Sequence, residues 1–182
     1  MSEYDIALEL ARLHILKGAD FVKQLKKITG LHIFKSVDGG NNIFAAEGSH
    51  RDDFPMLLDA ARKAVQLGNK VYILPNPKGI RTADFIFESR GIYKMYDLKT
   101  IQGKSSVLNR LLESIGQTNH ILLNMTTDYN ARLLAKEISK YFNVNPNAIE
   151  VLIFKGLKNI VVKREAVIDK DFVKTFMFSY YK

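Results

Sequence analysis

The sequence of 182 residues contains no cysteine. A disulfide framework, a thiolate metal site and a cysteine nucleophile are therefore excluded. No apolar run approaches the roughly 18 residues that a membrane-spanning helix needs. The acidic start, Met1 to Asp5, also lacks the basic and apolar segments of a secretory signal. We therefore expect a soluble, cytoplasmic protein.

Several common signatures of catalysis are also missing. The sequence has no P-loop, no GxSxG and no GxGxxG, and no two of its histidines have the spacing of zinc ligands. His14 and His32 lie in apolar runs and are expected to be packing residues. His50 differs, because it lies in a polar junction that leads into a predicted helix. There a histidine could act as a general acid or base.

Charge is the strongest compositional signal. The chain carries 27 Lys and Arg against 19 Asp and Glu, a formal net charge of +8. A positive surface potential favours polyanionic partners, of which nucleic acid is the commonest. Four basic side chains near predicted loops are the expected contacts with such a partner: Lys78, Arg81, Lys104 and Arg110.

The pattern of apolar and turn residues predicts an α+β fold, with a mixed β-sheet flanked by helices. Helices are expected over 4–25 with a break at Gly18, and over 53–67, 105–115 and 129–142. Strands are expected over 31–37, 42–46, 70–74, 83–88, 92–101, 120–125, 151–154 and 160–162. A boundary near Gly48 would separate an N-terminal helical and hairpin extension, 1–48, from a single nuclease-like domain, 49–182.

Two acids and a lysine form the main candidate site. If Ser89 to Ile92 closes a hairpin, Asp84 lies directly opposite Asp97 on the neighbouring strand. The two-residue period of a strand places Lys99 on the same face as Asp97. Facing carboxylates repel unless a cation or a proton intervenes. Such a pair suits an active site, in which the lysine could also steady a phosphate.

Polar residues downstream extend this candidate site. Lys104 and Ser105 belong to a polar loop that opens a helix, a place where backbone N–H groups can receive phosphate. Ser105 or its neighbour could equally be an ordinary helix cap. Gln117, at the end of that helix, and Asn124, on the next strand, could reach the same cleft. Either could instead satisfy local backbone groups.

Three segments, Thr82–Phe87, Tyr96–Ser105 and Gln117–Asn124, resemble the C-terminal tRNase domain of contact-dependent inhibition toxins. Related phage-borne nucleases share it, within the barnase, EndoU, colicin and RelE-like superfamily. The resemblance spans about a quarter of the 182 residues, together with the preceding helix and Val71–Pro75. Its motifs are short: an acidic-x-Lys-Thr strand and a Gln before an apolar strand. Family members often have Pro-Asp where this chain has Ala83-Asp84.

The resemblance implies metal-independent cleavage of tRNA or other RNA, without a cofactor, by attack of the 2′-hydroxyl on the adjacent phosphate. Lys99 would stabilise the transition state, Thr100 would help to orient the phosphate, and Asp97, Asp84 or His50 would move protons. The strand period places Thr100 opposite Lys99, which fits this role only if the strand bends. A cognate immunity protein is the partner that the resemblance suggests.

Two alternatives remain open from the residues themselves. The order of Asp84, a hairpin and Asp97-x-Lys99 is also similar to the PD-(D/E)XK nucleases, in which both acids bind magnesium to activate water on DNA. The same face could instead belong to a noncatalytic nucleic-acid-binding or phage structural module that only contacts phosphate. Metal dependence separates the two nucleases, and binding without cleavage would favour the module.

Overall fold

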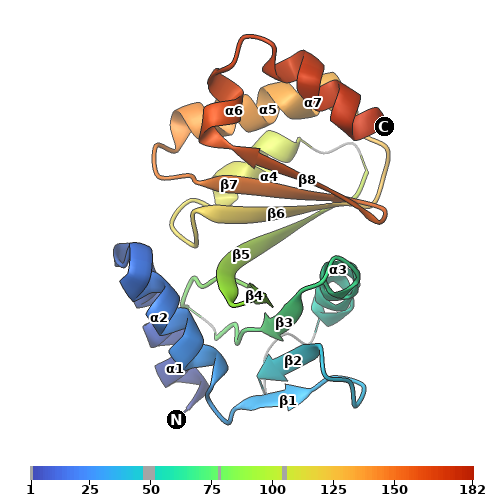
Figure 1. Cartoon of the computed structure of the whole chain (residues 1–182). Helices are drawn as coiled ribbons and strands as arrows, with labels where there is room; N and C mark the ends of the chain where they lie inside the picture. Colours follow the sequence, from blue (N-terminus) through green and yellow to red (C-terminus); the bar gives the residue numbers. More distant parts are fainter. Residues whose placement is uncertain (1, 47–51, 78, 104–105) are drawn as a thin grey trace. The chain divides into compact units, whose positions relative to one another are not determined.

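The protein is described by a computed structural model that covers residues 2–46, 52–77, 79–103 and 106–182 (Figure 1). The chain forms two compact units, Met1–Asp97 with Gly116–Thr118, and Leu98–Ile115 with Asn119–Lys182. Each unit contains strands flanked by helices, which confirms the predicted α+β class with a mixed sheet. The expected boundary at Gly48 lies outside the described residues, so the division into 1–48 and 49–182 stays a prediction.

Two helices begin the first unit. α1 (Glu3–Arg12) continues into a short 3-10 turn, Leu13–Ile15, and α2 (Gly18–Thr29) follows. The predicted break at Gly18 is confirmed, because its φ of +57° lies in the left-handed region that glycine tolerates. The helices bury an apolar face against Leu74, Ala83, Ile86 and Met95. This face is built from Ile6, Leu10, Leu13, Leu25 and Ile28.

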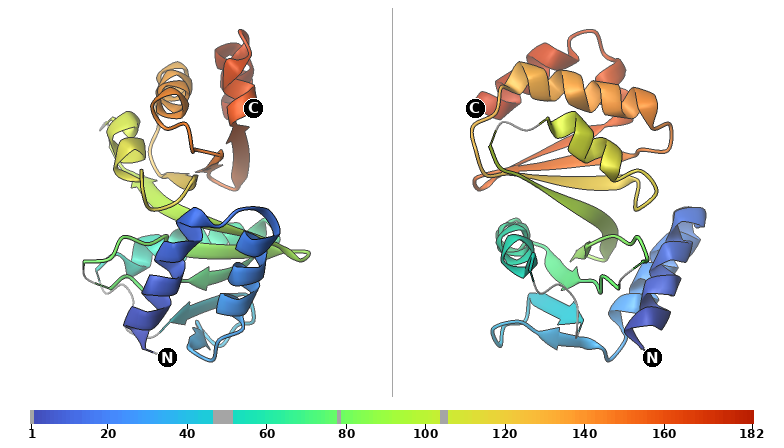
Figure 2. Two further views of the ribbon diagram at one scale, coloured as in Figure 1. Left: turned by 90° about the vertical axis from the view of Figure 1, so that its left-hand side faces the viewer. Right: turned by 180° about the vertical axis from the view of Figure 1, so that it is seen from behind.

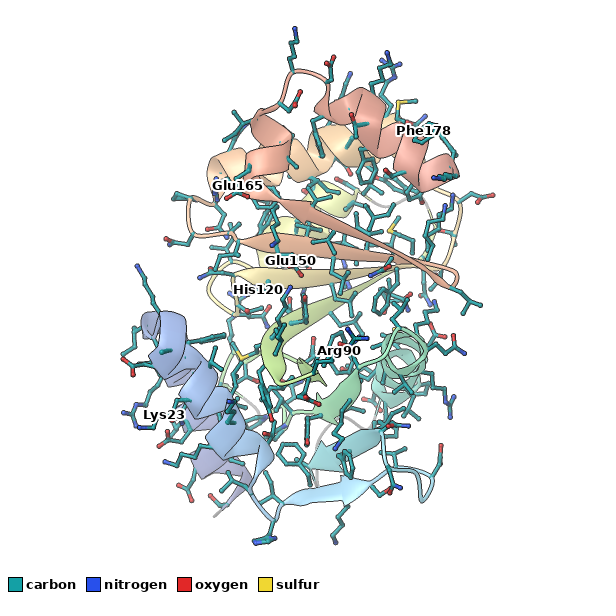
Figure 3. All side chains as sticks on the ribbon, viewed as in Figure 1. Lys23, Arg90, His120, Glu150, Glu165 and Phe178 are labelled. Atoms are coloured by element: carbon teal, nitrogen blue, oxygen red, sulfur yellow. The ribbon has the colours of Figure 1, made fainter. Side chains whose placement is uncertain are left out.

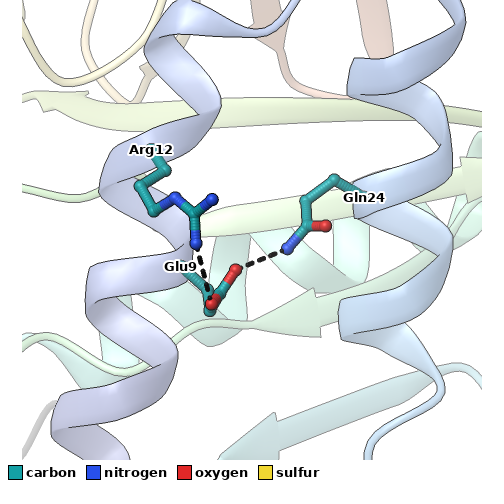
Figure 4. Close-up of polar contacts among 3 residues, drawn as sticks. All are labelled: Glu9, Arg12 and Gln24. Atoms are coloured by element: carbon teal, nitrogen blue, oxygen red, sulfur yellow. Dashed lines mark hydrogen bonds and ion pairs between the residues drawn. The ribbon is translucent and has the colours of Figure 1, made fainter.

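A polar contact joins these two helices as well (Figure 4). The Gln24 amide donates to Oε2 of Glu9 over 2.9 Å, and the Arg12 guanidinium donates to the other carboxylate oxygen over 3.2 Å. Glu9 is therefore held from its own helix and from the neighbouring one. The contact fixes how α1 lies beside α2 above their shared apolar face.

The sheet of the first unit has the order β1-β2-β3-β4-β5. Its strands are β1 (Phe34–Ser36), β2 (Ile43–Ala46), β3 (Lys70–Ile73), β4 (Phe85–Ser89) and β5 (Ile92–Ile101). β2 and β3 are parallel, and the other neighbours are antiparallel. The parallel pair is connected through α3 (Phe54–Gln66), which packs on β2 and β3.

Both predicted hairpins of this unit are confirmed. β1 pairs with β2 across a turn in which Asp38 and Gly39 have positive φ. β4 pairs with β5 from Ser89–Ile92 onward, so Arg90 and Gly91 form the two-residue tip, with φ of 51° and 79°. Positive φ at both tip residues matches the twist of the flanking strands. The register of β4 and β5 is thereby set by the turn.

The second unit contains the end of β5, from Leu98 on, with β6 (His120–Met125), β7 (Glu150–Lys155) and β8 (Lys158–Lys163). β6 and β7 are parallel, and β7 and β8 form an antiparallel hairpin. α4 (Val107–Glu113), α5 (Ala131–Val144) and α7 (Phe172–Tyr181) lie side by side over one face of the strands (Figure 2). α6 (Arg164–Ile168) follows β8 directly.

The core of the second unit lies between these helices and strands. Alternate residues of the strands point into it, including Ile121 and Leu123 of β6 and Val151 and Ile153 of β7. Leu122 and Leu152, at the positions between them, are buried as well, so these two strands are apolar at consecutive positions. Among the helices of the described ranges, none is long and apolar enough to cross a membrane.

Candidate functional site

Asp84 and Asp97 lie where the β4–β5 ladder ends. The last pair of the ladder is Phe85 with Tyr96, so the next pair along the same register would be Asp84 with Asp97. The Asp84 N–H donates to the Tyr96 carbonyl over 2.9 Å, and the Asp84 carbonyl accepts from the Leu74 N–H over 2.8 Å. The backbone of Asp84 is therefore held from both neighbouring strands.

The two acids differ in their exposure. Asp97 is buried, with 2% of its surface exposed, whereas Asp84 is half-buried. An ionised carboxylate out of water is costly unless hydrogen bonds or opposite charges compensate it. Each of the two acids interacts with other groups of the protein. The proton or cation expected between them from the sequence stays a prediction. The facing arrangement of their side chains stays a prediction.

Gln117 belongs to the first unit, as do Asp84 and Asp97. The next residue, Thr118, is buried and donates its hydroxyl to the Met95 carbonyl of β5 over 3.3 Å. This hydrogen bond fixes the segment 116–118 against β5 at Met95, which lies two residues before Asp97. The side-chain oxygen Oε1 of Gln117 is buried and has no hydrogen-bond partner in the described part of the chain. Buried side-chain oxygens usually have a partner, so this amide calls for an explanation.

Lys99 and Thr100 follow along β5 and belong to the second unit. Both residues are half-buried. The Thr100 hydroxyl oxygen, however, is buried and finds no hydrogen-bond partner among the described residues. β5 continues as a strand to Ile101, so the alternation of its side chains places Thr100 opposite Lys99. A joint role for the two side chains stays a prediction.

The predicted nucleic-acid contacts fall into two groups. Of the residues that the structure describes, Arg81 is exposed, Arg110 forms an ion pair with Glu113 at 3.6 Å, and Asn124 is fully buried in β6. A direct contact between Asn124 and nucleic acid would need its surroundings to open. The remaining predicted site residues lie outside the described residues: His50, Lys78, Lys104 and Ser105.

A satisfied polar network lies at the start of α4. The Tyr129 hydroxyl accepts from the Val107 N–H over 3.3 Å and donates to Oε2 of Glu137 over 2.9 Å. Ser106 donates to the other carboxylate oxygen of Glu137 over 3.3 Å. Burial, and to a lesser degree the bonded Glu137 carboxylate, raise the pKa of Tyr129 above its ordinary value of 10.0. The network fixes α4 against α5.

Glu150 was not among the residues expected at the site, and it is 1% exposed at the start of β7 (labelled in Figure 3). In register, Glu150 pairs with His120 of β6 and with Lys163 of β8. A titratable row thus crosses three strands of the second unit. One signal was present in the sequence, because Glu150 is the only charged residue in the run from Asn143 to Phe154.

No group of three or more His, Asp or Glu within the described ranges could hold a metal ion. Asp84 and Asp97 supply two carboxylates. Carboxylate oxygens are ligands that Mg²⁺ prefers, and this ion commonly takes one or two of them and completes its shell with water and substrate phosphate. The donor types at the ladder end therefore suit such a cation.

No protein-family profile and no curated protein matches the chain. Among solved structures, it is similar to a chain of the CdiA-CT/CdiI toxin and immunity complex from Burkholderia pseudomallei. The likeness has 15% identity and a TM-score of 0.39, and it covers 68% of this chain and 99% of that one. A likeness of this size carries no argument about function.

Proposed function

We propose that this chain is a toxin-like nuclease that cleaves RNA without a metal ion. The observation that supports the proposal is the state of Thr100 and Gln117, two of the residues expected at the site. Each has a buried side-chain oxygen with no hydrogen-bond partner among the described residues. Such an oxygen costs about 1–3 kcal/mol of stability. A substrate that opens the surroundings of these two oxygens on binding would supply their missing hydrogen bonds.

The proposed reaction is an attack of the RNA 2′-hydroxyl on the adjacent phosphate, with departure of the 5′-oxygen. One protein group accepts the proton of the 2′-hydroxyl and another donates a proton to the leaving oxygen. Asp97, Asp84 and His50 are the candidates for these two roles. Lys99 would stabilise the negative charge that develops on the phosphate, and the Thr100 hydroxyl would donate a hydrogen bond to it. Oε1 of Gln117 would accept a hydrogen bond from a hydroxyl or a base N–H of the RNA.

The ladder end favours a second candidate function. Asp84 is held beside Tyr96, at the next register position to Asp97, which is where two carboxylates of a magnesium-dependent nuclease would stand. In that case both acids would hold the cation, and the cation would activate water for attack on DNA. Lys99 would again contact the phosphate. An immunity protein that blocks the site is a further proposal, suggested by the sequence resemblance.

A cleavage assay distinguishes these functions. The protein is incubated with total RNA and with plasmid DNA, each with magnesium and with EDTA, and the ends of the products are identified. We expect RNA cleavage that continues in EDTA and leaves 2′,3′-cyclic phosphate ends. DNA cleavage that stops in EDTA would establish the magnesium-dependent function instead. Binding of either polymer without cleavage would show a noncatalytic module.

A further inference from the structure

The second unit contains an open cavity of about 320 Å³ beside α5 and α7. Six side chains line it: Arg132 of α5, and Lys170, Asp171, Val173, Lys174 and Met177 at the start of α7. Three of these side chains are cations and one is an acid. Two apolar side chains, Val173 and Met177, stand one helical turn apart on α7 and form the rest of the lining.

The three cations have no structural task. Arg132, Lys170 and Lys174 are exposed, and within the described ranges none of them forms an ion pair or a hydrogen bond. Arg132 and Lys174 lie in the first turns of their helices. The helix dipole is positive at that end and disfavours a cation there. Arg132 and Lys174 therefore lower the stability slightly, and no ion pair or hydrogen bond within the described ranges offsets this cost.

The surroundings of the cavity add to its positive potential. Arg132 lies in the first turn of α5, and Val173 and Lys174 lie in the first turn of α7, so the positive ends of both helix dipoles lie beside the cavity. Only Asp171 opposes this charge among the lining residues. A site with converging cations and an adjacent apolar wall suits a ligand with an anionic group beside an apolar one. A phosphodiester strand has both, in its phosphates and its bases.

We propose that this cavity binds the backbone of a single-stranded nucleic acid, with a phosphate held by Arg132, Lys170 and Lys174 and a base against Val173 and Met177. The inference deepens the proposed nuclease function and rests on it for the identity of the polymer. The cavity contributes affinity and does not take part in cleavage. It provides affinity that is independent of base sequence, as phosphate contacts do.

Binding of labelled oligonucleotides to the whole chain tests the proposal by fluorescence anisotropy. One probe is 2′-O-methyl RNA, which lacks the attacking hydroxyl, and the other is DNA of the same sequence. We expect Lys170→Gln with Lys174→Gln to raise Kd about tenfold. The slope of log affinity against log salt should fall by about 1.4, since each single-strand phosphate contact contributes about 0.7.

A matched control is available on α2 of the first unit. Lys23 and Lys27 have the same spacing, are exposed and lie outside the cavity (Lys23 is labelled in Figure 3). Lys23→Gln with Lys27→Gln removes the same charge and should change Kd less than about twofold. If both double variants weaken binding equally, net charge explains the affinity and the proposal is wrong.

Asp171→Asn provides a test that misfolding cannot imitate. It removes the one carboxylate of the cavity and should tighten binding about threefold, because the phosphate then meets less repulsion. Unchanged or weaker binding of this variant contradicts the proposal. The probes cannot be cleaved at a 2′-hydroxyl, so the outcome is separate from catalysis. If the chain binds the probes as expected but never cleaves RNA, the cavity proposal stands and the nuclease proposal is wrong. If the chain cleaves RNA but the cavity variants do not change binding, the nuclease proposal stands and the cavity proposal is wrong.

Discussion

The polar network at the start of α4 and the polar side chains along β5 are satisfied to different extents. At α4, the Tyr129 hydroxyl both accepts and donates a hydrogen bond, and both oxygens of Glu137 are bonded. On β5 and beside it, Thr100 and Gln117 keep buried oxygens that are unbonded within the described residues. The first arrangement stabilises the fold. The second costs stability, so we ascribe it to the binding of a substrate.

The largest change is expected in the rate of RNA cleavage, when a charged residue of β5 is removed. Lys99→Ala should lower the rate of RNA cleavage at least about a hundredfold, because the charge of the transition state loses its stabilising cation. The free energy of unfolding should change by no more than about 1 kcal/mol, since the side chain is only half-buried. Single-turnover cleavage and urea unfolding measure the two quantities. A cleavage rate close to that of the unmodified protein would remove Lys99 from the mechanism.

Two tyrosines of the second unit allow bonded and unbonded hydroxyls to be compared by their effect on the free energy of unfolding. Tyr129→Phe removes two hydrogen bonds and should lower the free energy of unfolding by about 1–2 kcal/mol. Tyr180 is also buried, but its hydroxyl has no partner in the described part of the chain. Tyr180→Phe should therefore leave the free energy of unfolding unchanged or raise it. Equal losses in the two variants would show that the hydrogen bonds of Tyr129 contribute little.

The smallest expected effect is a dependence of stability on alkaline pH. Burial raises the pKa of Tyr129 and of Tyr180 above 10.0, with the Asp128 carboxylate adding to the shift of Tyr180. Each group then loses its proton more easily in the unfolded chain, so its contribution is complete below about pH 10 and is lost as the pH rises further. Urea unfolding at about pH 8 and about pH 11 should show the loss. The variant with both Tyr129→Phe and Tyr180→Phe should lose less free energy of unfolding over this pH range than the unmodified protein. An identical loss in both proteins would show that other groups cause the effect.

Much of the fold could be predicted because local signals agreed with the tertiary structure. The Arg90-Gly91 tip set the register of β4 and β5, and the apolar run that follows His120 predicted β6 to the residue. The helices after β8 were not predicted. α7 places Phe172, Phe176 and Tyr180 on one face at helical spacing, but its aromatic and β-branched residues have little helix propensity of their own. Packing against the core therefore decides its structure.

The candidate site was predictable only in part. The spacing of Asp97 and Lys99 and the hairpin before them follow from short-range rules. The burial of Asp97 and the unbonded oxygen of Gln117 depend on how segment 116–118 lies against β5, which no local pattern specifies. The cavity shows the same limit, since Arg132 and Lys174 meet only because α5 packs beside α7.

The unbonded oxygens of Thr100 and Gln117 are proposed to bind substrate, whereas that of Tyr180 lies outside the candidate site. Thr100→Val tests this proposal. Valine keeps the shape of the side chain and replaces the unbonded hydroxyl with a methyl group. The rate of RNA cleavage and the free energy of unfolding are measured on the same preparation. We expect cleavage to fall at least about tenfold while stability is unchanged or rises by up to about 1 kcal/mol. Full cleavage activity, or a loss of stability that accounts for the lost activity, would contradict the claim.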